Sequence, residues 1–494
     1  MLEWVRGWLA DERLEGCRLV VVTRGALGVV EGEGVVDLGG ASVWGLLRSA
    51  QSEYPGRMVL VDLEADVAGF GSGGVPDVVR DVVGSGLDQV AVRGGRLLVP
   101  RLMPVSGAVS GVGEVIEWGD GTVVVTGATG TLGRLVARRL VGEHGVRSLL
   151  LLSRAGEGAV GAGELRAELE AAGARVEFAA CDVADRGALA GVLGAVPAER
   201  ALVGVVHTAG VAEDGVFSQL GRERLERVLR PKVDGAWNLH ELTRGCGLKV
   251  FVLYSSLAGL LGTAGQANYA AGNAFLDGLA SLRRAAGLPA VSMVWGLWEE
   301  SSAISGDLGE ADLRRLSRMG LRALSSSEGM DLFDAALTSR EPVVALTGMD
   351  TGALRAQGAD VPVLLQGLVP AARRRALSGS ADGGGGEGRS LAGRLAGLAA
   401  DERERALVDL VRGVVAGILG HEDAREVEAD RAFQEMGFDS LNAVELRNRL
   451  NALGGLKLAN TVVFDYPSVS ALAGFLDTQL TDQHTPPPHT LLTT

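Results

Sequence analysis

Short apolar runs alternate with amphipathic stretches along most of the first 350 residues. The runs predict six strands, at Thr122–Thr126, Ser148–Ser153, Arg175–Ala180, Ala201–His207, Val250–Ser255 and Ala290–Trp295. Continuous apolar runs of this length are typical of parallel strands that are buried on both faces. With helices between them and right-handed crossovers, they predict an α/β fold with a Rossmann-like, doubly wound parallel sheet.

The first 118 residues show a shorter version of the same alternation. Apolar runs at 18–23 and 57–62 flank a stretch with helical spacing between Ala41 and Glu53. No glycine-rich turn follows either run, so this part of the chain is expected to be structural and not catalytic.

The last quarter of the chain has a different character. Residues 371–390 are rich in Arg, Ser and Gly, and such a segment is expected to be a flexible linker. A small helical bundle is predicted for 391–480, and a disordered tail rich in Thr and Pro for 481–494. The chain before the linker then divides into the structural segment, 1–118, and the segment with the doubly wound sheet, 119–370.

Length and charge narrow the classes of function. A chain of 494 residues exceeds what one core usually supports. The net charge of −14 argues against nucleic acid or an anionic membrane as a partner. The three cysteines, Cys17, Cys181 and Cys246, form no CxxC pair, so we expect no disulfide framework, no metal site and a cytoplasmic location. No apolar run reaches about 18 residues, the length of a membrane span.

A glycine-rich turn follows the strand at 122–126 and opens a helix. Gly127 would permit a tight turn, Gly130 would let the backbone approach a pyrophosphate, and Gly133 would allow close packing of the helix on the strand. The N–H groups at the helix start would face the anion. The candidate cofactor contacts here are Thr126, Gly127, Thr129, Gly130, Thr131, Leu132 and Gly133.

The next two strands end in further candidate contacts. Ser153 and Arg154 stand where an NAD-binding protein would carry an acid for the ribose 2′-hydroxyl. An Arg there suits a 2′-phosphate and favours NADPH, although a solvated surface Arg is the alternative. Asp182, followed by Val183, is expected to hydrogen-bond the adenine or to cap the following helix.

One of only four tyrosines, Tyr269, lies 13 residues after Ser256. Reduction of a ketone requires a proton donor at the oxygen, which a phenol can supply, and a second hydroxyl can hold the same oxygen. This spacing is the arrangement of short-chain dehydrogenases/reductases. The Tyr-x-x-x-Lys of that superfamily is absent, because position 273 is Asn, and Lys232 is the one lysine nearby.

Together these residues resemble the ketoreductase domains of modular type I polyketide synthases, in which the Lys and the Asn have exchanged places. The resemblance implies NADPH-dependent reduction, with Tyr269, Ser256, Lys232 and Asn273 as the catalytic residues. In that family the cation lowers the pKa of the tyrosine and the Asn supports the proton path. Ala209 and Gly210 match a turn that faces the cofactor.

Two positions bear on stereochemistry. Asp214 matches the last residue of the family's Leu-Asp-Asp motif, and Leu261 stands where A-type reductases carry Trp. These two residues favour a B-type reductase, which gives the D-configured (3R) alcohol. The first 118 residues resemble only the later part of the family's pseudo-Rossmann structural subdomain, so we expect this subdomain to be truncated at its N-terminus.

The helical segment contains Gly437-Phe-Asp-Ser440-Leu at the start of a helix, followed by Leu446–Leu450 and Val463–Pro467. These segments resemble an acyl carrier domain, which implies a covalent 4′-phosphopantetheine on Ser440. A phosphodiester there would lie at a helix N-terminus, where the dipole favours negative charge.

The whole pattern implies reduction of a carrier-bound β-ketoacyl thioester to the (3R)-β-hydroxyacyl thioester. The implied partners are the β-ketoacyl thioester, ketosynthase and acyltransferase domains upstream or on other chains, and a phosphopantetheinyl transferase. Two alternatives remain open at this point. One is a carrier and scaffold unit whose reductase fold does not reduce, and the other is a piece of an iterative fatty-acid-type synthase.

Overall fold

The computed structural model describes residues 1–65, 74–105, 116–300, 316–317, 319–358, 361–369, 391, 395, 397–421, 423–459 and 461–482. These residues form two compact units, one up to residue 369 and one from residue 391 onward. The predicted linker at 371–390 lies outside the described residues, as does the predicted tail beyond residue 482.

The centre of the first unit is a seven-stranded sheet in which every pair of neighbours is parallel. Its order is β12-β10-β9-β8-β5-β6-β7. The strands are thus added outward from β5 to β7 and then, from β8 onward, on the other side of β5, so the strand order reverses between β5 and β8. The strands are β5 Thr122–Thr126, β6 Ser148–Ser153, β7 Arg175–Ala180, β8 Leu202–His207, β9 Val250–Ser256, β10 Val291–Trp295 and β12 Val343–Leu346. The predicted doubly wound sheet is confirmed. In such sheets, ligands bind at the carboxyl ends of the strands beside this reversal.

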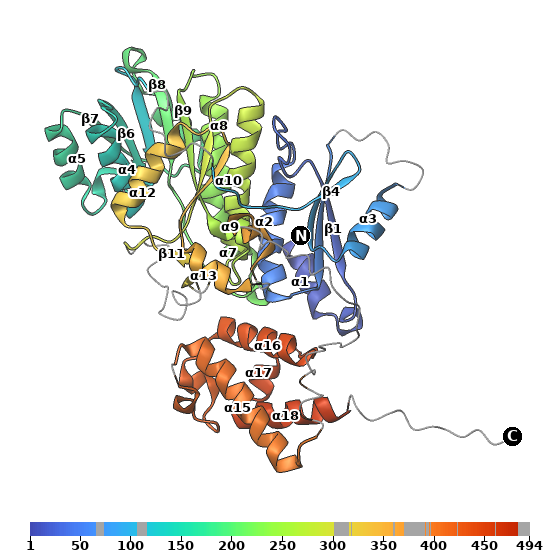
Figure 1. Ribbon diagram of the computed structural model, residues 1–494. Helices are drawn as coiled ribbons and strands as arrows, with labels where there is room; N and C mark the ends of the chain where they lie inside the picture. Colours follow the sequence, from blue (N-terminus) through green and yellow to red (C-terminus); the bar gives the residue numbers. More distant parts are fainter. Residues whose placement is uncertain are drawn as a thin grey trace, which may run out of the picture. The chain divides into compact units, whose positions relative to one another are not determined.

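Helices cover both faces of this sheet (Figure 1). Successive strand residues point to opposite faces, so Val123 and Val125 pack on one side and Val124 on the other. One face is covered by α4 Thr131–Gly142, α5 Ala162–Ala171 and α12 Ser326–Leu337. The opposite face is covered by α6 Arg186–Gly194, α8 Gly235–Thr243 and α10 Ala267–Ala285. The same unit also contains α7 Arg222–Leu229, α9 Leu257–Leu261 and α13 Thr351–Ala356.

The N-terminal part of the unit forms a second, four-stranded sheet. Its strands are β1 Leu19–Arg24, β2 Met58–Leu63, β3 Gln89–Arg93 and β4 Arg96–Leu98, of which the first three are parallel. Its helices are α1 Leu2–Ala10, α2 Leu38–Glu53 and α3 Gly74–Ser85. At the ends of its strands the buried Asp62 accepts hydrogen bonds from Ala26 N (2.9 Å) and Arg93 Nη2 (2.8 Å). This buried ion pair lies near the carboxyl ends of β2 and β3.

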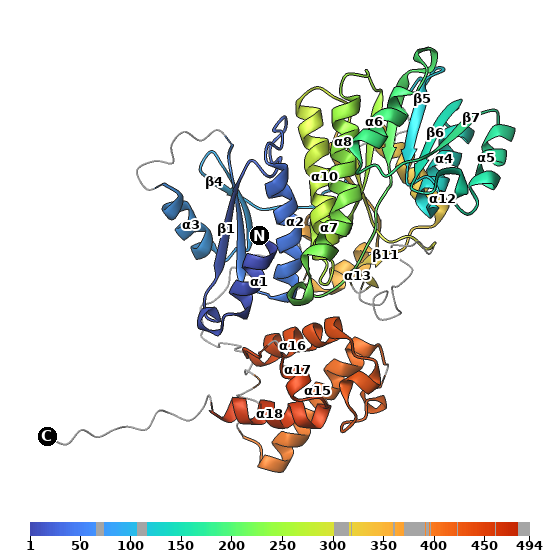
Figure 2. The same cartoon turned by 180° about the vertical axis from the view of Figure 1, so that it is seen from behind.

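The two sheets belong to one unit because α2 packs along α10, as both views show (Figure 2). The helices come so close that a Cβ added at Gly45 would lie 2.2 Å from the carbonyl oxygen of Ala270. Ser42 Oγ also donates a hydrogen bond to Ala271 O (2.9 Å). The absence of a side chain at Gly45 therefore permits the contact between the two subdomains.

The second unit is a small helical bundle, as predicted. Its helices are α15 Ala400–Leu419, α16 Ser440–Gly454, α17 Val462–Asp465 and α18 Val469–Asp482. One apolar cluster forms its core, with Leu407, Val411, Leu446, Leu450 and Leu472 fully buried. In neither unit does a described helix combine the length and apolar character needed to cross a bilayer.

Candidate active site and carrier site

The turn between β5 and α4 requires glycine at two positions. Gly127 has a φ of +66°, and a Cβ there would lie 2.8 Å from Ala209 N, in the loop after β8. A Cβ at Gly133 would lie 2.4 Å from Gly127 O. Gly130 is the N-cap of α4, and no side chain caps that helix. The helix N-terminus at the reversal point of the sheet therefore fits a nucleotide pyrophosphate.

The residues at the end of β6 fit the adenosine half of such a cofactor. Among the described residues, Ser153 Oγ is buried and has no hydrogen-bond partner, whereas the neighbouring Arg154 is exposed. A hydroxyl and a guanidinium can both donate hydrogen bonds to a phosphate.

Asp182, after β7, makes local contacts. Its Oδ1 accepts a hydrogen bond from Ala184 N (3.0 Å), and its Oδ2 pairs with Arg230 Nη2 (3.1 Å). Helix α6 is capped by Asp185, whose Oδ1 accepts from Ala188 N (3.0 Å), so the alternative role of Asp182 as the helix cap is wrong. Val183, beside it, is buried.

His207, at the end of β8, connects the end of β5, directly before the glycine-rich turn, to the segment that carries Lys232. Its Nε2 lies 3.0 Å from Pro231 O, and its Nδ1 lies 2.7 Å from Thr126 Oγ1. Because a carbonyl only accepts, Nε2 carries the proton and Nδ1 accepts from Thr126. Burial, with the charge of Lys232, lowers the pKa of His207 to about 3 and keeps it neutral. Sequence reasoning missed this residue, and the one available signal was a histidine that ends a buried strand.

Lys232 lies in a single π-helical turn, Arg230–Asp234, between α7 and α8. It is 3% exposed, and its Nζ donates to Tyr254 O (3.0 Å) and lies 5.0 Å from the centre of the Tyr269 ring. Burial lowers its pKa to about 7, an effect that the carboxylate of Asp277 partly opposes. The ammonium of Lys232 thus lies beside the phenol of Tyr269, as the family resemblance implied.

Tyr269 is the third residue of α10, and its neighbour fixes the start of that helix. Asn268 Oδ1 accepts from Tyr269 N (2.8 Å), and Asn268 Nδ2 donates to Glu213 O (2.8 Å). Burial raises the pKa of Tyr269 to about 12, although hydrogen bonds with Asn273 and Ser256 favour the phenolate. The expectation of a lowered tyrosine pKa is therefore wrong, because burial penalises the charged phenolate more than these hydrogen bonds favour it.

Ser256 and Asn273 complete the cluster around this phenol. Ser256 ends β9, and its Oγ accepts from Ala258 N (3.3 Å) at the start of α9. Asn273 lies one helical turn after Tyr269, and its Nδ2 donates to Tyr269 O (2.9 Å). Among the described residues, the buried Asn273 Oδ1 has no partner. The structure therefore brings Lys232, Ser256, Tyr269 and Asn273 together from three separate elements, the π-helical turn, β9 and α10.

The two residues assigned to stereochemistry lie in different surroundings. Asp214 Oδ2 accepts from Gln266 Nε2 (2.8 Å), immediately before the helix that carries Tyr269. Leu261 ends α9 and packs against an apolar cluster that contains Leu257 and Val294. Asp214 thus binds the residue that caps α10, the helix that carries Tyr269, whereas Leu261 contributes to local packing.

Ser440 is the first residue of α16 in the carrier bundle, and it is half-buried. Asp439 caps the helix, its Oδ1 accepting from Asn442 N (2.7 Å). Gly437, with a φ of +87°, ends the preceding turn, and Phe438 packs on Phe433 with 5.2 Å between ring centres. The hydroxyl stands at a helix N-terminus, where a phosphodiester would be stabilised.

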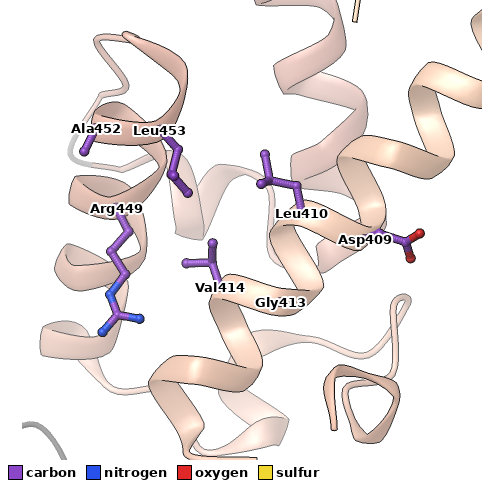
Figure 3. A pocket seen from close by; sticks show the side chains of 7 residues that line it. All are labelled: Asp409, Leu410, Gly413, Val414, Arg449, Ala452 and Leu453. Carbon is purple, nitrogen blue, oxygen red and sulfur yellow. The ribbon is translucent and has the colours of Figure 1, made fainter. Parts of the chain in front are cut away.

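A groove of about 570 Å³ runs between α15 and α16 on the same bundle. Figure 3 shows Leu410 and Val414 of α15 facing Leu453 of α16 across it. Arg449 lines the groove nine residues after Ser440 along the chain.

Comparisons with known proteins agree with this geometry. Residues 121–300 match the model of the KR domain, 409–476 match the phosphopantetheine attachment site, and 1–102 match the Rossmann fold domain of the polyketide synthase extender module SpnB. A solved A1-type ketoreductase is 38% identical, with a TM-score of 0.65, and the match covers 71% of this chain and 73% of that one. The chain belongs to the polyketide synthase ketoreductases. Its second unit is a carrier domain with a phosphopantetheine attachment site.

Similar curated proteins are much longer than this ketoreductase and carrier pair. Polyketide synthase GfsA of Streptomyces halstedii is 50% identical over 99% of this chain, which spans 6% of its length. Mycoketide-CoA synthase of Mycobacterium tuberculosis is 49% identical over 75% of this chain, with 9% of its own length covered. A solved C2-type ketoreductase is 34% identical, with a TM-score of 0.63 and coverages of 71% and 75%. The ketoreductase thus resembles solved members of more than one type.

Proposed function

We propose that the first unit reduces a β-ketoacyl thioester carried on Ser440, with NADPH, to the (3R)-β-hydroxyacyl thioester. The observation that carries this proposal is the convergence of Lys232, Ser256, Tyr269 and Asn273 beside a glycine-rich nucleotide turn. Bound NADPH would supply a hydride to the carbonyl carbon.

Tyr269 supplies the proton in this proposal. As the new C–H bond forms, the electron pair of the C=O π bond moves to oxygen, and the phenol O–H gives that oxygen its proton. With a pKa of about 12, the phenol is protonated at neutral pH and can act as the acid. Ser256 donates a second hydrogen bond to the same oxygen.

Lys232 and Asn273 act on the tyrosine. The phenolate left after proton transfer is stabilised by the ammonium, which lies 5.0 Å from the ring centre. The Oδ1 atom of Asn273 offers a buried acceptor on the path by which a proton returns to Tyr269. Neutral His207 keeps the Lys232 turn beside Thr126 and so beside the cofactor loop.

The choice of NADPH rests on the end of β6. Arg154 is exposed there, and a guanidinium can bind a 2′-phosphate through paired hydrogen bonds. The buried Ser153 Oγ offers a further donor to the same group. Thr129, Thr131 and Leu132 of the loop, with Val183, Ala209 and Gly210 after β7 and β8, would line the rest of the cofactor site.

The (3R) configuration rests on Asp214 and Leu261. Asp214 is held at the start of the catalytic helix by Gln266, and leucine replaces the tryptophan of A-type reductases. The solved neighbours include A1-type and C2-type ketoreductases, so overall similarity does not select the type. These two residues are the basis for proposing a B-type product.

In the longer assembly, a phosphopantetheinyl transferase would load Ser440, and ketosynthase and acyltransferase domains outside this chain would supply the β-ketoacyl group. The test uses the whole chain, loaded with phosphopantetheine, a synthetic β-ketoacyl thioester, and NADPH or NADH. We expect loss of the reduced-nicotinamide absorbance, faster with NADPH, and a (3R) alcohol by chiral chromatography. Absence of oxidation with either cofactor would favour the non-reducing scaffold alternative.

A further inference from the structure

The last two turns of α2, in the N-terminal subdomain, contact the connection between α9 and α10. Ser49 Oγ donates to Thr263 O (2.6 Å), and Ser52 Oγ donates to Gly262 O (2.6 Å). Arg48, one turn before Ser52 and next to Ser49, also donates from its Nη1 to Gly259 O (2.9 Å) in α9. A helix outside the nucleotide-binding sheet thus holds the chain segment that leads from Ser256 to Tyr269.

Glu53, the last residue of α2, makes the contacts of greatest consequence. Its side chain is fully buried (0% exposed), and its two carboxylate oxygens bind different segments. Oε1 accepts from Gly265 N (3.0 Å), and Oε2 accepts from Phe217 N (2.7 Å). A buried carboxylate is tolerated only where strong donors replace its hydration, so both backbone N–H groups are held firmly.

These two N–H groups flank the catalytic and stereochemical residues. Gly265 lies four residues before Tyr269, and Phe217 lies three residues after Asp214. The segments also bind one another directly, since Gly215 N donates to Gly265 O (2.7 Å). With the bond from Gln266 to Asp214, the carboxylate of Glu53 completes a closed set of contacts that fixes the separation between Asp214 and Tyr269.

We propose that Glu53 is a positioning residue of the ketoreductase: through Gly265 and Phe217 it fixes the Asp214 loop against the Tyr269 helix and so determines which face of the ketone receives hydride. This proposal rests on the proposed reduction. Nothing in the sequence around Glu53 indicates the role, because the two segments it joins lie more than 160 residues further along the chain.

The test is Glu53→Gln in the whole chain. The amide has the same shape, but its NH2 group faces a backbone N–H donor, so one of the two bonds is lost. We expect kcat/KM for a β-ketoacyl thioester to fall about tenfold and the minor alcohol to increase about tenfold, because a small misplacement of reacting groups is costly. The dissociation constant of NADPH, measured by its fluorescence, stays unchanged, since the cofactor loop is not involved.

A matched control comes from the same helix. Gln51 Nε2 donates to Met58 O (3.1 Å) and Asp88 O (2.9 Å), both within the N-terminal subdomain. Gln51 Oε1 also accepts from Gln89 Nε2 (3.0 Å) in the same subdomain. Gln51→Ala therefore removes three hydrogen bonds, none of them with the active-site loops, and it should lower the melting temperature while keeping the ratio of the two alcohols. If Glu53→Gln behaves in the same way, Glu53 only stabilises the fold and the proposal is overturned.

Hydrogen exchange of the protein without substrate separates this proposal from the proposed function. In Glu53→Gln, peptides spanning 211–218 and 262–268 should exchange at least about tenfold faster than in the unsubstituted chain. Unchanged exchange would show that Glu53 does not fix these two segments, and it would overturn this proposal even if the chain reduces ketones. Faster exchange would support the role of Glu53 in holding the two segments even if the chain reduces no ketone. Should Glu53→Gln fail to fold, Glu53→Asp keeps the charge with a shorter reach and should give the same changes at smaller amplitude.

Discussion

Replacing Lys232 by Met should separate the stability of the reductase unit from its activity. The ammonium is 3% exposed, and burial lowers its pKa from 10.5 to about 7. Between these two pH values the unfolded chain binds more protons than the folded one, so the stability of the unsubstituted protein rises with pH across that window. Below pH 7 the buried charge costs its full amount, and above pH 10.5 it costs nothing.

The magnitude follows from the same shift. At about 1.4 kcal/mol per tenfold change, the burial of Lys232 costs roughly 4 to 5 kcal/mol at pH 6.5 and about 1 to 2 kcal/mol at pH 9.5. Met removes this cost but leaves Tyr254 O without its donor, which costs about 1 to 3 kcal/mol at either pH. Lys232→Met should therefore be more stable than the unsubstituted protein at pH 6.5, and this advantage should shrink by about 3 kcal/mol at pH 9.5.

The assay is urea unfolding of the whole chain at both pH values, followed by tryptophan fluorescence, because Trp118, Trp295 and Trp298 all lie in the core of the reductase unit. Ketone reduction by the same variant should fall, since no cation then stabilises the phenolate of Tyr269. Equal differences in unfolding free energy at the two pH values would refute the reasoning, as would a variant that is less stable at pH 6.5.

Three further substitutions test other parts of the molecule. Tyr269→Phe removes the proton donor, so kcat for ketone reduction should fall at least about 100-fold while the NADPH affinity measured by fluorescence is kept; a normal rate would exclude Tyr269 as the acid. Ser440→Ala should prevent the mass increase that a phosphopantetheinyl transferase and coenzyme A produce in the intact chain, and a modified variant would place the arm elsewhere. Gly45→Ala introduces a Cβ 2.2 Å from Ala270 O and should destabilise the unit by about 1 to 3 kcal/mol in thermal melts followed by circular dichroism. An unchanged melting temperature would show that α2 and α10 can separate without cost.

The strands of the large sheet could be predicted from the sequence because their burial on both faces makes them continuous apolar runs. The six predicted strands agree with the structure to within one residue at each end. The seventh, β12, was missed because Val343–Leu346 is a short apolar run directly after a proline. The hairpin of β3 and β4 was missed because charged residues interrupt its apolar pattern. One of them, Arg93, is nevertheless buried, and it pairs with Asp62.

The candidate site could be predicted only where its residues are close in sequence or match a known family. Ser256 ends β9, and Tyr269 and Asn273 lie one turn apart on α10, the second helix after that strand, so these three residues are close in the sequence. Lys232 came from resemblance alone, since no sequence pattern reveals a π-helical turn. Contacts such as those of Glu53 depend on the tertiary fold, which periodicity does not encode.

The close contact of α2 with α10 has a consequence for the exchange of reductase modules between assembly lines. Fifteen of the nineteen residues of α10 are buried, so this helix has almost no side of its own to present to water. A recombinant boundary placed near residue 119 would remove α2 from the surface of α10. It would then expose apolar residues of α10 next to Tyr269 and Asn273. Chimaeras should therefore be joined upstream of both sheets, and those cut between them should aggregate.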